Sequence, residues 1–255
     1  MERIDIGGAS VEMLIQGEGR PLLFLHGIDY FAQHRPFLDR LAKEFRVVAP
    51  RHPGFGASPR PGWMRTIGDL AYLYLDLVDR LALDGVTLVG ASFGGWLAME
   101  LAVRSTARLG GLVLIDSLGL KFGGRDEAEI ADIYAFSAAE AVARTFADPR
   151  NAPDYAALDD AAVEEVARDR EAAVLYGWRP YMHNPSLAHW LHRVKVPSLV
   201  IWGEKDRIVA PAYGAHLTQR LQNARFVPIA AAGHYPQIEQ PDAVAQAIAG
   251  FAQEI

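Results

Sequence analysis

One serine of this chain lies in a pattern that could make it a nucleophile. Ser92 is the centre of residues 90–94, G-A-S-F-G, which fit G-x-S-x-G. The pattern is short, and its usual alternative is a glycine-rich turn with a capping serine. Its context is more informative, because residues 86–90 predict a buried strand and a helical pattern follows Ser92 directly. A sharp strand-to-helix turn of this kind exposes a serine hydroxyl and needs small neighbours on both sides.

A serine hydroxyl needs a general base to take its proton, and the expected base is a histidine on a loop after a late strand. His234 lies in residues 232–236, A-G-H-Y-P, just after the strand predicted at 225–229. It is the histidine beyond Ser92 that occupies a glycine-flanked loop at a predicted strand end. The other histidines beyond Ser92 fall in or near helical segments: His183, His189, His192 and His216.

The base in turn needs an acid that orients it. Asp206 follows the strand predicted at 198–202, and the chain order Ser92, Asp206, His234 suits a serine on such a turn. Two other acids compete, Glu204 in the same loop and Asp116 at the end of the preceding strand. Asp206 could also be a turn residue that binds local backbone. We favour Asp206 as the third member of the triad.

A serine that attacks an acyl group also needs donors for the oxyanion that forms. One donor should be the backbone N–H of Phe93, at the positive end of the helix that follows the serine. The second should be the N–H of Ile28, in the loop after the strand predicted at 22–25. His26 opens that loop, and we expect it to brace the loop through backbone hydrogen bonds.

The elements that position these residues alternate between apolar strands and amphipathic helices. Strand patterns occur at 10–16, 22–25, 46–50, 86–90, 112–116, 198–202 and 225–229. Helical patterns follow several of them, including one capped by Thr66 and a last one at 242–251. Uninterrupted apolar strands that alternate with helices predict an α/β fold, with a mostly parallel sheet and helices on both faces.

The alternation stops between residues 117 and 195. That stretch has no clear buried strand, and it holds helical patterns at 126–146 and 159–175, followed by aromatic residues at 176–181. We interpret residues 118–195 as a helical cap inserted into a core formed by 1–117 and 196–255. Aromatic and apolar side chains from the cap and the core would then line the substrate site: Trp96, Trp178, Tyr181, Met182 and Tyr235.

Composition narrows the function further. The 255 residues include no cysteine, which excludes disulfides, a thiol nucleophile and thiolate metal sites. No nucleotide-binding motif or metal-ligand spacing is present, so we expect no cofactor and no metal. The net charge of −6 argues against a nucleic-acid partner. We therefore expect a small-molecule substrate, no membrane association and a cytoplasmic location, and we leave a homodimer open.

The chain resembles the α/β-hydrolase superfamily over almost its whole length. The resemblance rests on segments that occur in the family's order: His26-Gly27, Pro53-Gly54-Phe55-Gly56-Ala57-Ser58, the turn at Ser92, Trp202-Gly203-Glu204-Lys205-Asp206 and Gly233-His234. The insertion at 118–195 occupies the place of the family's helical cap. One departure is Arg51-His52, where many members have an Asp. That position shapes a loop, and His52 would reach the rim of the pocket.

The resemblance implies a hydrolase and leaves its substrate to be chosen. Relatives that open epoxides or displace halides carry Asp as the nucleophile, so Ser92 disfavours both reactions. Relatives with serine include carboxylesterases, thioesterases, lactonases and carbon–carbon bond hydrolases of aromatic degradation. We expect a small, largely apolar carboxylic ester. The alternatives are a carbon–carbon bond hydrolase, although those often have Trp where this chain has Tyr235, and a non-catalytic small-ligand receptor on the same fold.

Overall fold

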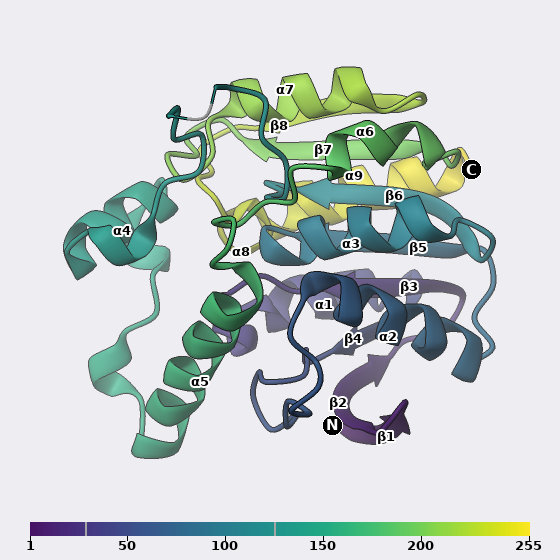
Figure 1. Ribbon diagram of the computed structural model, residues 1–255, viewed down its shortest axis with the longest axis horizontal. Coiled ribbons are helices and arrows are strands. Elements are labelled where there is room, and N and C mark those ends of the chain that lie inside the picture. The colour runs from purple at the N-terminus through teal and green to yellow at the C-terminus, as the bar shows by residue number, and fades with distance from the viewer. Residues whose placement is uncertain (29, 125) are drawn as a thin grey trace.

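The computed structural model describes residues 1–28, 30–124 and 126–255, and these form one mixed β-sheet (Figure 1). Its eight described strands run in the order β1-β2-β4-β3-β5-β6-β7-β8. β1 and β2 pair antiparallel, as do β2 and β4, and every later pairing is parallel. The strands are β1 (Glu2–Ile6), β2 (Ala9–Gln16), β3 (Arg20–Leu25), β4 (Phe45–Pro50), β5 (Val86–Ala91), β6 (Leu109–Ile115), β7 (Ser198–Gly203) and β8 (Ala224–Ile229). The mostly parallel α/β sheet expected from the sequence is confirmed.

Helices cover both faces of the sheet because alternate residues of the central strands point to opposite sides. In β5, Leu88 packs into the cluster that holds α2 (Ile67–Arg80), α3 (Phe93–Arg104) and α7 (Pro211–Arg220). The next residue, Val89, packs into the cluster on the other face with α1 (Arg35–Leu41) and α9 (Pro241–Gln253). Buried side chains on both faces explain the uninterrupted apolar strands of the sequence.

The capping signal at the start of α2 is borne out in detail. The Thr66 hydroxyl accepts the Asp69 N–H at 3.1 Å, and the Asp69 carboxylate accepts the Thr66 N–H at 2.8 Å. This reciprocal capping box satisfies two of the helix's unpaired amide groups. Strand β1, in contrast, was not among the predicted strands. Its first residues are exposed, and it lies at the sheet edge, where it pairs with β2, so it lacks the buried apolar pattern of the others.

The first part of the segment between β6 and β7 lies at the carboxyl edge of the parallel strands, and its last helix returns along the sheet beside α3 (Figure 1). Its α-helices are α4 (Ala138–Thr145), α5 (Asp160–Gly177) and α6 (Leu187–Trp190). Short 3-10 turns occur at Ile133–Ala135, Pro149–Asn151, Tyr155–Ala157 and Leu191–Arg193.

The helix expected over 126–146 is therefore wrong for its first half. Ile130 instead forms an isolated antiparallel bridge with Val209, and its side chain is buried. That tertiary contact overrides the local helical preference. Helix α4 begins only after Ser137, which caps it together with Glu140.

Helix α5 is tied to the loop after β4 by a buried ion pair. The Arg51 guanidinium lies 3.2 Å from the Asp169 carboxylate and 2.8 Å from that of Glu165. The second Asp169 oxygen accepts the Gly56 N–H at 2.6 Å. Nearby, the Tyr176 hydroxyl donates to the Pro53 carbonyl at 3.0 Å. The Pro-Gly-Phe-Gly loop and α5 therefore hold each other in place.

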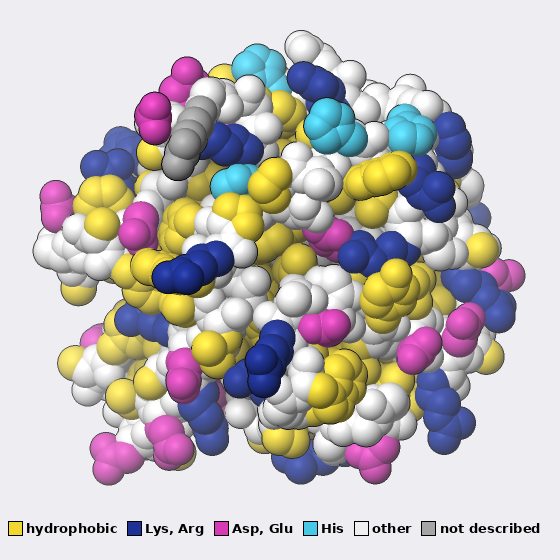
Figure 2. All heavy atoms as spheres, viewed as in Figure 1, with side chains coloured by type: hydrophobic (Ala, Val, Ile, Leu, Met, Phe, Trp, Pro, Cys, Tyr) yellow, Lys and Arg dark blue, Asp and Glu magenta, His cyan; other side chains and the backbone are white. Residues whose placement is uncertain are grey.

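On the face drawn in Figure 2, Lys and Arg side chains are interspersed with Asp and Glu, and hydrophobic side chains are scattered among them. This face therefore does not gather charge of one sign. The expectation that nucleic acid is no partner stays a prediction. Within the described ranges, no helix combines the length and the apolar character that a bilayer crossing requires.

Candidate active site

Ser92 stands on a strained turn between β5 and α3. Its backbone has φ 52° and ψ −115°, a conformation that residues other than glycine rarely adopt. The flanking glycines are required sterically. A Cβ atom on Gly94 would lie 2.0 Å from the Leu25 carbonyl oxygen, and one on Gly90 would lie 2.3 Å from the Gly94 carbonyl oxygen. The turn packs so closely against the sheet that only hydrogen atoms fit at these two positions.

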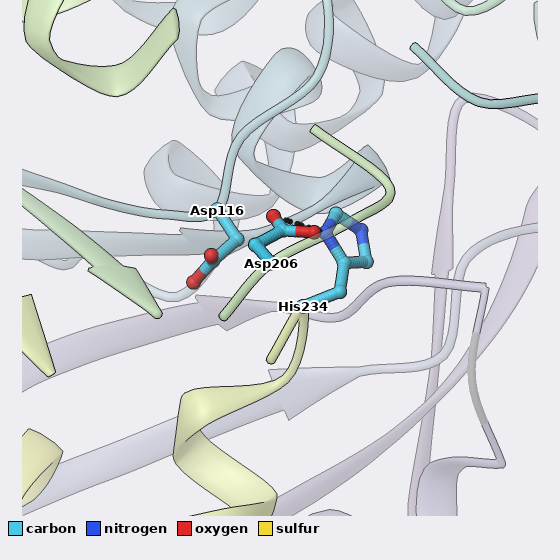
Figure 3. Close-up of side chains that lie close together, drawn as sticks. All are labelled: Asp116, Asp206 and His234. Atoms are coloured by element: carbon cyan, nitrogen blue, oxygen red, sulfur yellow. Dashed lines mark hydrogen bonds and ion pairs between the residues drawn. The ribbon is translucent and has the colours of Figure 1, made fainter. Parts of the chain in front are cut away.

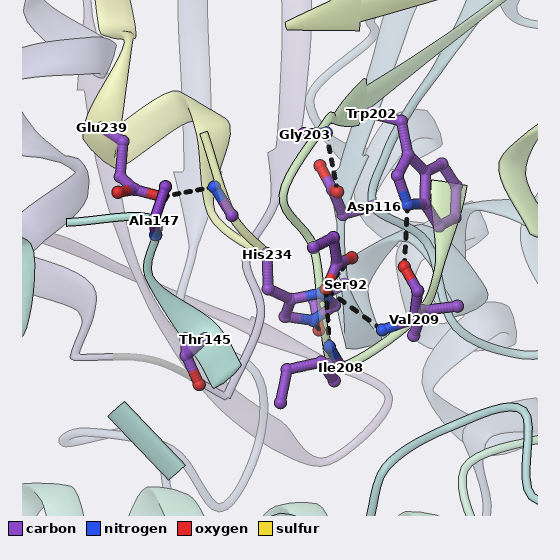
Figure 4. A network of polar contacts seen from close by, with 12 residues as sticks. Ser92, Asp116, Thr145, Ala147, Trp202, Gly203, Ile208, Val209, His234 and Glu239 are labelled. Carbon is purple, nitrogen blue, oxygen red and sulfur yellow. Dashed lines mark hydrogen bonds and ion pairs between the residues drawn. The ribbon is translucent and has the colours of Figure 1, made fainter. Parts of the chain in front are cut away.

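The structure brings Ser92, His234 and Asp206 together in a continuous chain of hydrogen bonds. Figure 4 shows Ser92 beside the His234 imidazole. The Ser92 Oγ lies 2.8 Å from the His234 Nε2, and the His234 Nδ1 lies 2.8 Å from the Asp206 Oδ2. A neutral imidazole that donates from Nδ1 to the carboxylate has its Nε2 free to accept the serine proton. This arrangement is the one that activates a serine for attack.

The three residues are buried: Ser92, His234 and Asp206 are 1%, 3% and 4% exposed. The other Asp206 oxygen accepts the N–H groups of Ile208 at 2.8 Å and Val209 at 3.0 Å. Protein donors therefore replace water at both carboxylate oxygens. The carboxylate is held with one oxygen directed at the imidazole.

Neither of the two alternative acids, Glu204 and Asp116, is the hydrogen-bond partner of His234. Glu204 is exposed, and within the described part of the chain its carboxylate makes no hydrogen bond to His234. Asp116 is buried beside Asp206, but its carboxylate accepts the Gly203 N–H at 3.0 Å, and the imidazole nitrogen bonds to Asp206 instead. The geometry therefore favours Asp206 over both.

Hydrogen bonds to two residues far from Ser92 in the sequence, Thr145 and Glu239, hold the histidine loop. The His234 N–H donates to the Thr145 carbonyl at 2.7 Å, so α4 contacts the loop directly. Glu239, in the short helix α8 (Pro236–Glu239), accepts the Gly233 N–H at 2.5 Å and the N–H groups of Ala147 and Asp148 at 3.2 and 3.0 Å. Sequence reasoning missed both Thr145 and Glu239. No local pattern marks them, because their role depends on contacts between distant segments.

The two expected oxyanion donors lie next to the nucleophile in the chain or on the cavity that it lines. Phe93 is the first residue of α3, directly after Ser92, and Ile28 lines the same cavity as the Ser92 side chain. A backbone N–H at a helix N-terminus is well placed to stabilise a developing negative charge. The assignment of both N–H groups as oxyanion donors stays a prediction.

His26 and His52 form a stacked pair beneath this loop, with ring centroids 4.0 Å apart. The His26 Nδ1 contacts the Gly27 carbonyl at 2.7 Å, and its Nε2 accepts the His52 N–H at 3.3 Å. Burial, followed by the neighbouring His52 and Arg51, lowers the pKa of His26 well below its ordinary value. A neutral His26 therefore braces the loop.

His52 does not reach the rim of the pocket as expected. It is fully buried, and its ring contacts the Tyr74 hydroxyl at 2.6 Å and the His26 carbonyl at 3.0 Å. His52, which departs from the Asp that many relatives have here, is therefore packed inside the core. A hydroxyl and a carbonyl group satisfy both of its ring nitrogens there.

A small cavity of about 30 Å³ adjoins the Ser92 hydroxyl. Its lining is mostly apolar: Ile28, Ser92, Leu118, Ile130, Ala131, Ile133, Thr145, Tyr181, Met182, Ile208, His234 and Tyr235. Small-molecule sites usually measure roughly 300–1,000 Å³. A substrate can therefore enter only if side chains of the lining move apart, and many of them belong to the segment between β6 and β7.

The five residues predicted to line the substrate site are divided between two cavities. Tyr181, Met182 and Tyr235 line the cavity at Ser92. Trp96 and Trp178 line a separate, more open cavity of about 450 Å³, together with Arg65 and Arg179. The structure does not bring these two tryptophans to the serine, because Trp96 turns toward Glu100, to which its Nε1–H donates at 3.1 Å.

One group among the described residues has donor atoms close enough to share a metal ion. Asp116, Asp206 and His234 place such atoms within 4.8 Å of one another. Both ring nitrogens of His234 are already engaged, one by Asp206 and the other by Ser92. We therefore interpret the group as part of a hydrogen-bonded triad and not as a set of metal ligands.

Comparisons with known proteins identify the family and several relatives of this chain. The family model for the "Alpha/beta hydrolase family" matches residues 22–247. The 2-hydroxymuconate semialdehyde hydrolase of Pseudomonas sp. (strain CF600) is 29% identical over 261 aligned positions, which cover 93% of this chain and 88% of that protein. Haloalkane dehalogenase 2 of Mycobacterium bovis is 28% identical, with 96% and 92% covered. The structure of a thermophilic esterase from Thermogutta terrifontis has a TM-score of 0.77 and 25% identity, and covers 100% of this chain and 99% of that one.

Proposed function

This chain belongs to the alpha/beta hydrolase family, and from that premise we propose that it is a serine hydrolase for a small, largely apolar carboxylic ester. The observation that carries the proposal is the hydrogen-bonded chain from Ser92 through His234 to Asp206, beside an apolar cavity. The cavity supports the substrate class, and the chain of hydrogen bonds supports the reaction.

In the first half of the reaction, the Ser92 Oγ attacks the ester carbonyl carbon while the His234 Nε2 takes its proton. The carbonyl oxygen becomes an oxyanion, which the N–H groups of Ile28 and Phe93 would stabilise. Asp206 stays ionised and stabilises the imidazolium. The tetrahedral intermediate then expels the alcohol, which leaves with the proton held by His234, and an acyl-enzyme remains on Ser92.

In the second half, a water molecule takes the place of the alcohol. His234 removes one of its protons as the water oxygen attacks the acyl carbon, and the second tetrahedral intermediate forms in the same oxyanion site. Its collapse returns the proton to the Ser92 oxygen and releases the carboxylic acid. The same three side chains therefore serve both halves of the reaction.

The lining of the cavity favours a neutral acyl group. Among the described residues that line it, none is Lys, Arg, Asp or Glu. A substrate that placed a carboxylate there would leave a buried charge without a partner, which is strongly unfavourable. A short aliphatic or aromatic acyl group would instead gain from contact with Ile130, Ile133 and Met182.

The second candidate is a carbon–carbon bond hydrolase. It is favoured by the 29% identity to 2-hydroxymuconate semialdehyde hydrolase over 93% of this chain. A muconate-derived substrate carries a carboxylate, however, and no Lys or Arg is among the described residues that line the cavity at Ser92. Arg65 and Arg179 line the separate cavity, together with Trp96. A receptor on the same fold, without turnover, is the third candidate.

One set of assays distinguishes the three. Purified protein is given short p-nitrophenyl esters and, separately, a 2-hydroxy-6-oxo-dienoate, and Ser92→Ala is the control. We expect Ser92-dependent release of p-nitrophenol with efficiency on the order of 10⁴ M⁻¹s⁻¹ or more. Efficient turnover of the dienoate with slow ester hydrolysis would favour the second candidate. Binding of either compound without turnover would favour the receptor.

A further inference from the structure

A second buried carboxyl group lies beside the proposed triad acid. Asp116 directly follows β6, is fully buried and has a positive φ of 41°. Its carboxyl group lies next to that of Asp206, on the side away from His234 (Figure 3). Backbone strain of this kind is retained where the surrounding structure fixes the side chain for a purpose.

The two carboxyl groups differ in the donors that they receive. Asp206 accepts two backbone N–H groups, from Ile208 and Val209, as well as the imidazole N–H of His234. Asp116 accepts the Gly203 N–H at its Oδ1, and its buried Oδ2 has no hydrogen-bond partner in the described part of the chain. Negative charge is therefore better stabilised on Asp206, and a proton is better placed on Asp116.

We propose that Asp116 is a positioning residue of this site: as a neutral carboxylic acid, it donates a hydrogen bond from Oδ2 to the Asp206 carboxylate and holds that carboxylate toward His234. The proton gives the orphaned Oδ2 a partner and removes the repulsion between two adjacent buried anions. A buried carboxylic acid that stays neutral can serve as a donor in this way. The catalytic consequence rests on the proposed function, whereas the position of the proton does not.

The surroundings of Asp116 support this protonation state. Burial raises the pKa of Asp116 well above its ordinary value, and the charge of Asp206 raises it further, with a smaller contribution from Glu239. The Gly203 N–H acts in the opposite direction. The titratable groups that face Asp116 are thus acidic ones from the loop after β7 and from α8, and His234 lies beyond Asp206.

The activity test compares two substitutions at position 116. Asp116→Ala removes the donor, and we expect kcat on a neutral ester to fall about ten- to a hundredfold with little change in KM, as for a lost hydrogen bond to a charged group. Asp116→Asn supplies an N–H donor in the same place and an oxygen for the Gly203 N–H, so it should restore most of that loss. Glu204→Gln, an exposed acid in the neighbouring loop, is the matched control.

The proton itself is tested without any substrate. A carboxyl group whose pKa is raised in the folded protein makes the protein less stable as pH rises. The loss occurs between the ordinary pKa of the group, about 3.9, and its pKa in the folded protein. Asn cannot titrate, so the melting temperature of Asp116→Asn relative to the unmodified protein should rise steadily from about pH 5 to about pH 8. In Asp116→Ala, the low-field proton resonance of the His234 Nδ1–H should shift, because Asp206 is less firmly held.

Two results would overturn the proposal. One is a melting-temperature difference that stays constant or falls with rising pH, since Asp116 would then be ionised. The other is an Asp116→Asn protein as impaired as Asp116→Ala, since a donor at that position would then be irrelevant. Failure of the protein to hydrolyse any ester would refute the proposed substrate, and the melting and resonance data would still decide where the proton resides.

Discussion

Replacing Asp169 with Asn should loosen the contact between α5 and the loop after β4. The side chains of Arg51 and Asp169 are only 6% and 2% exposed, so the substitution leaves a buried guanidinium with one charged partner fewer. Removing one member of a buried ion pair costs about 3–5 kcal/mol. Glu165, 26% exposed, still contacts Arg51 at 2.8 Å. Because this second partner remains, we expect a smaller loss of about 2–3 kcal/mol, at or just below that range.

The substitution is specific because an Asn oxygen can still accept the Gly56 N–H that Asp169 accepts at 2.6 Å. The loss therefore reports the charge and not that hydrogen bond. Glu164→Gln is the matched control on the same helix: Glu164 is 72% exposed and lies 3.7 Å from Arg168, so its removal should leave stability unchanged within error.

Urea unfolding gives the change in stability, and hydrogen exchange of the Gly56 amide reports whether the loop opens locally. The double substitution Arg51→Met with Asp169→Asn should cost less than the sum of the single ones, with a coupling of at least about 1 kcal/mol. Since α5 leads into Met182 at the cavity, KM should change more than kcat. Equal stability of Asp169→Asn and Glu164→Gln would refute the reasoning.

Three further predictions concern the site and its support. Ser92→Ala should lower kcat for a neutral ester on the order of 10⁶-fold, and Asp206→Asn on the order of 10⁴-fold; an intact kcat in Asp206→Asn would make Asp116 the acid. His26 is held neutral with a lowered pKa, so the unfolded chain binds a proton that the folded one does not. The free energy of unfolding should thus fall as pH drops below about 6.5, by up to about 1.4 kcal/mol per pH unit. Urea unfolding at several pH values measures this dependence, and His26→Gln should lack it. Ile133→Ala enlarges the cavity at Ser92 and should shift the preference among p-nitrophenyl esters toward longer acyl chains; an unchanged preference would place the acyl group elsewhere.

The choice between Asp206 and Asp116 shows where sequence reasoning ends. Asp116 follows β6 and Asp206 follows β7, and these strands are parallel neighbours, so both residues lie at the same edge of the sheet. Which of them meets His234 depends on the path of the two loops and on the backbone donors around each carboxyl group. Those features depend on contacts between segments far apart in the chain, which a local motif does not encode.

The substrate cavity depends even more on tertiary structure. Aromatic residues of a helical segment can face the core, a cavity or solvent, and their spacing does not distinguish these. Tyr181 and Met182 reach the cavity at Ser92, whereas Trp178, only three residues before Tyr181, is 48% exposed and lines a different cavity.

The sequence by itself determined the parallel sheet, its covering helices and the turn that carries Ser92, because buried strands, capped helices and flanking glycines leave patterns within a few residues. It also placed His234 and Asp206 on loops at the right edge of that sheet. Only the tertiary structure decided which residues of the segment between β6 and β7 reach the cavity at Ser92 and how Thr145 and Glu239 hold the histidine loop. Those outcomes depend on packing and hydrogen bonds between distant segments, where each contact is set by the positions of both partners.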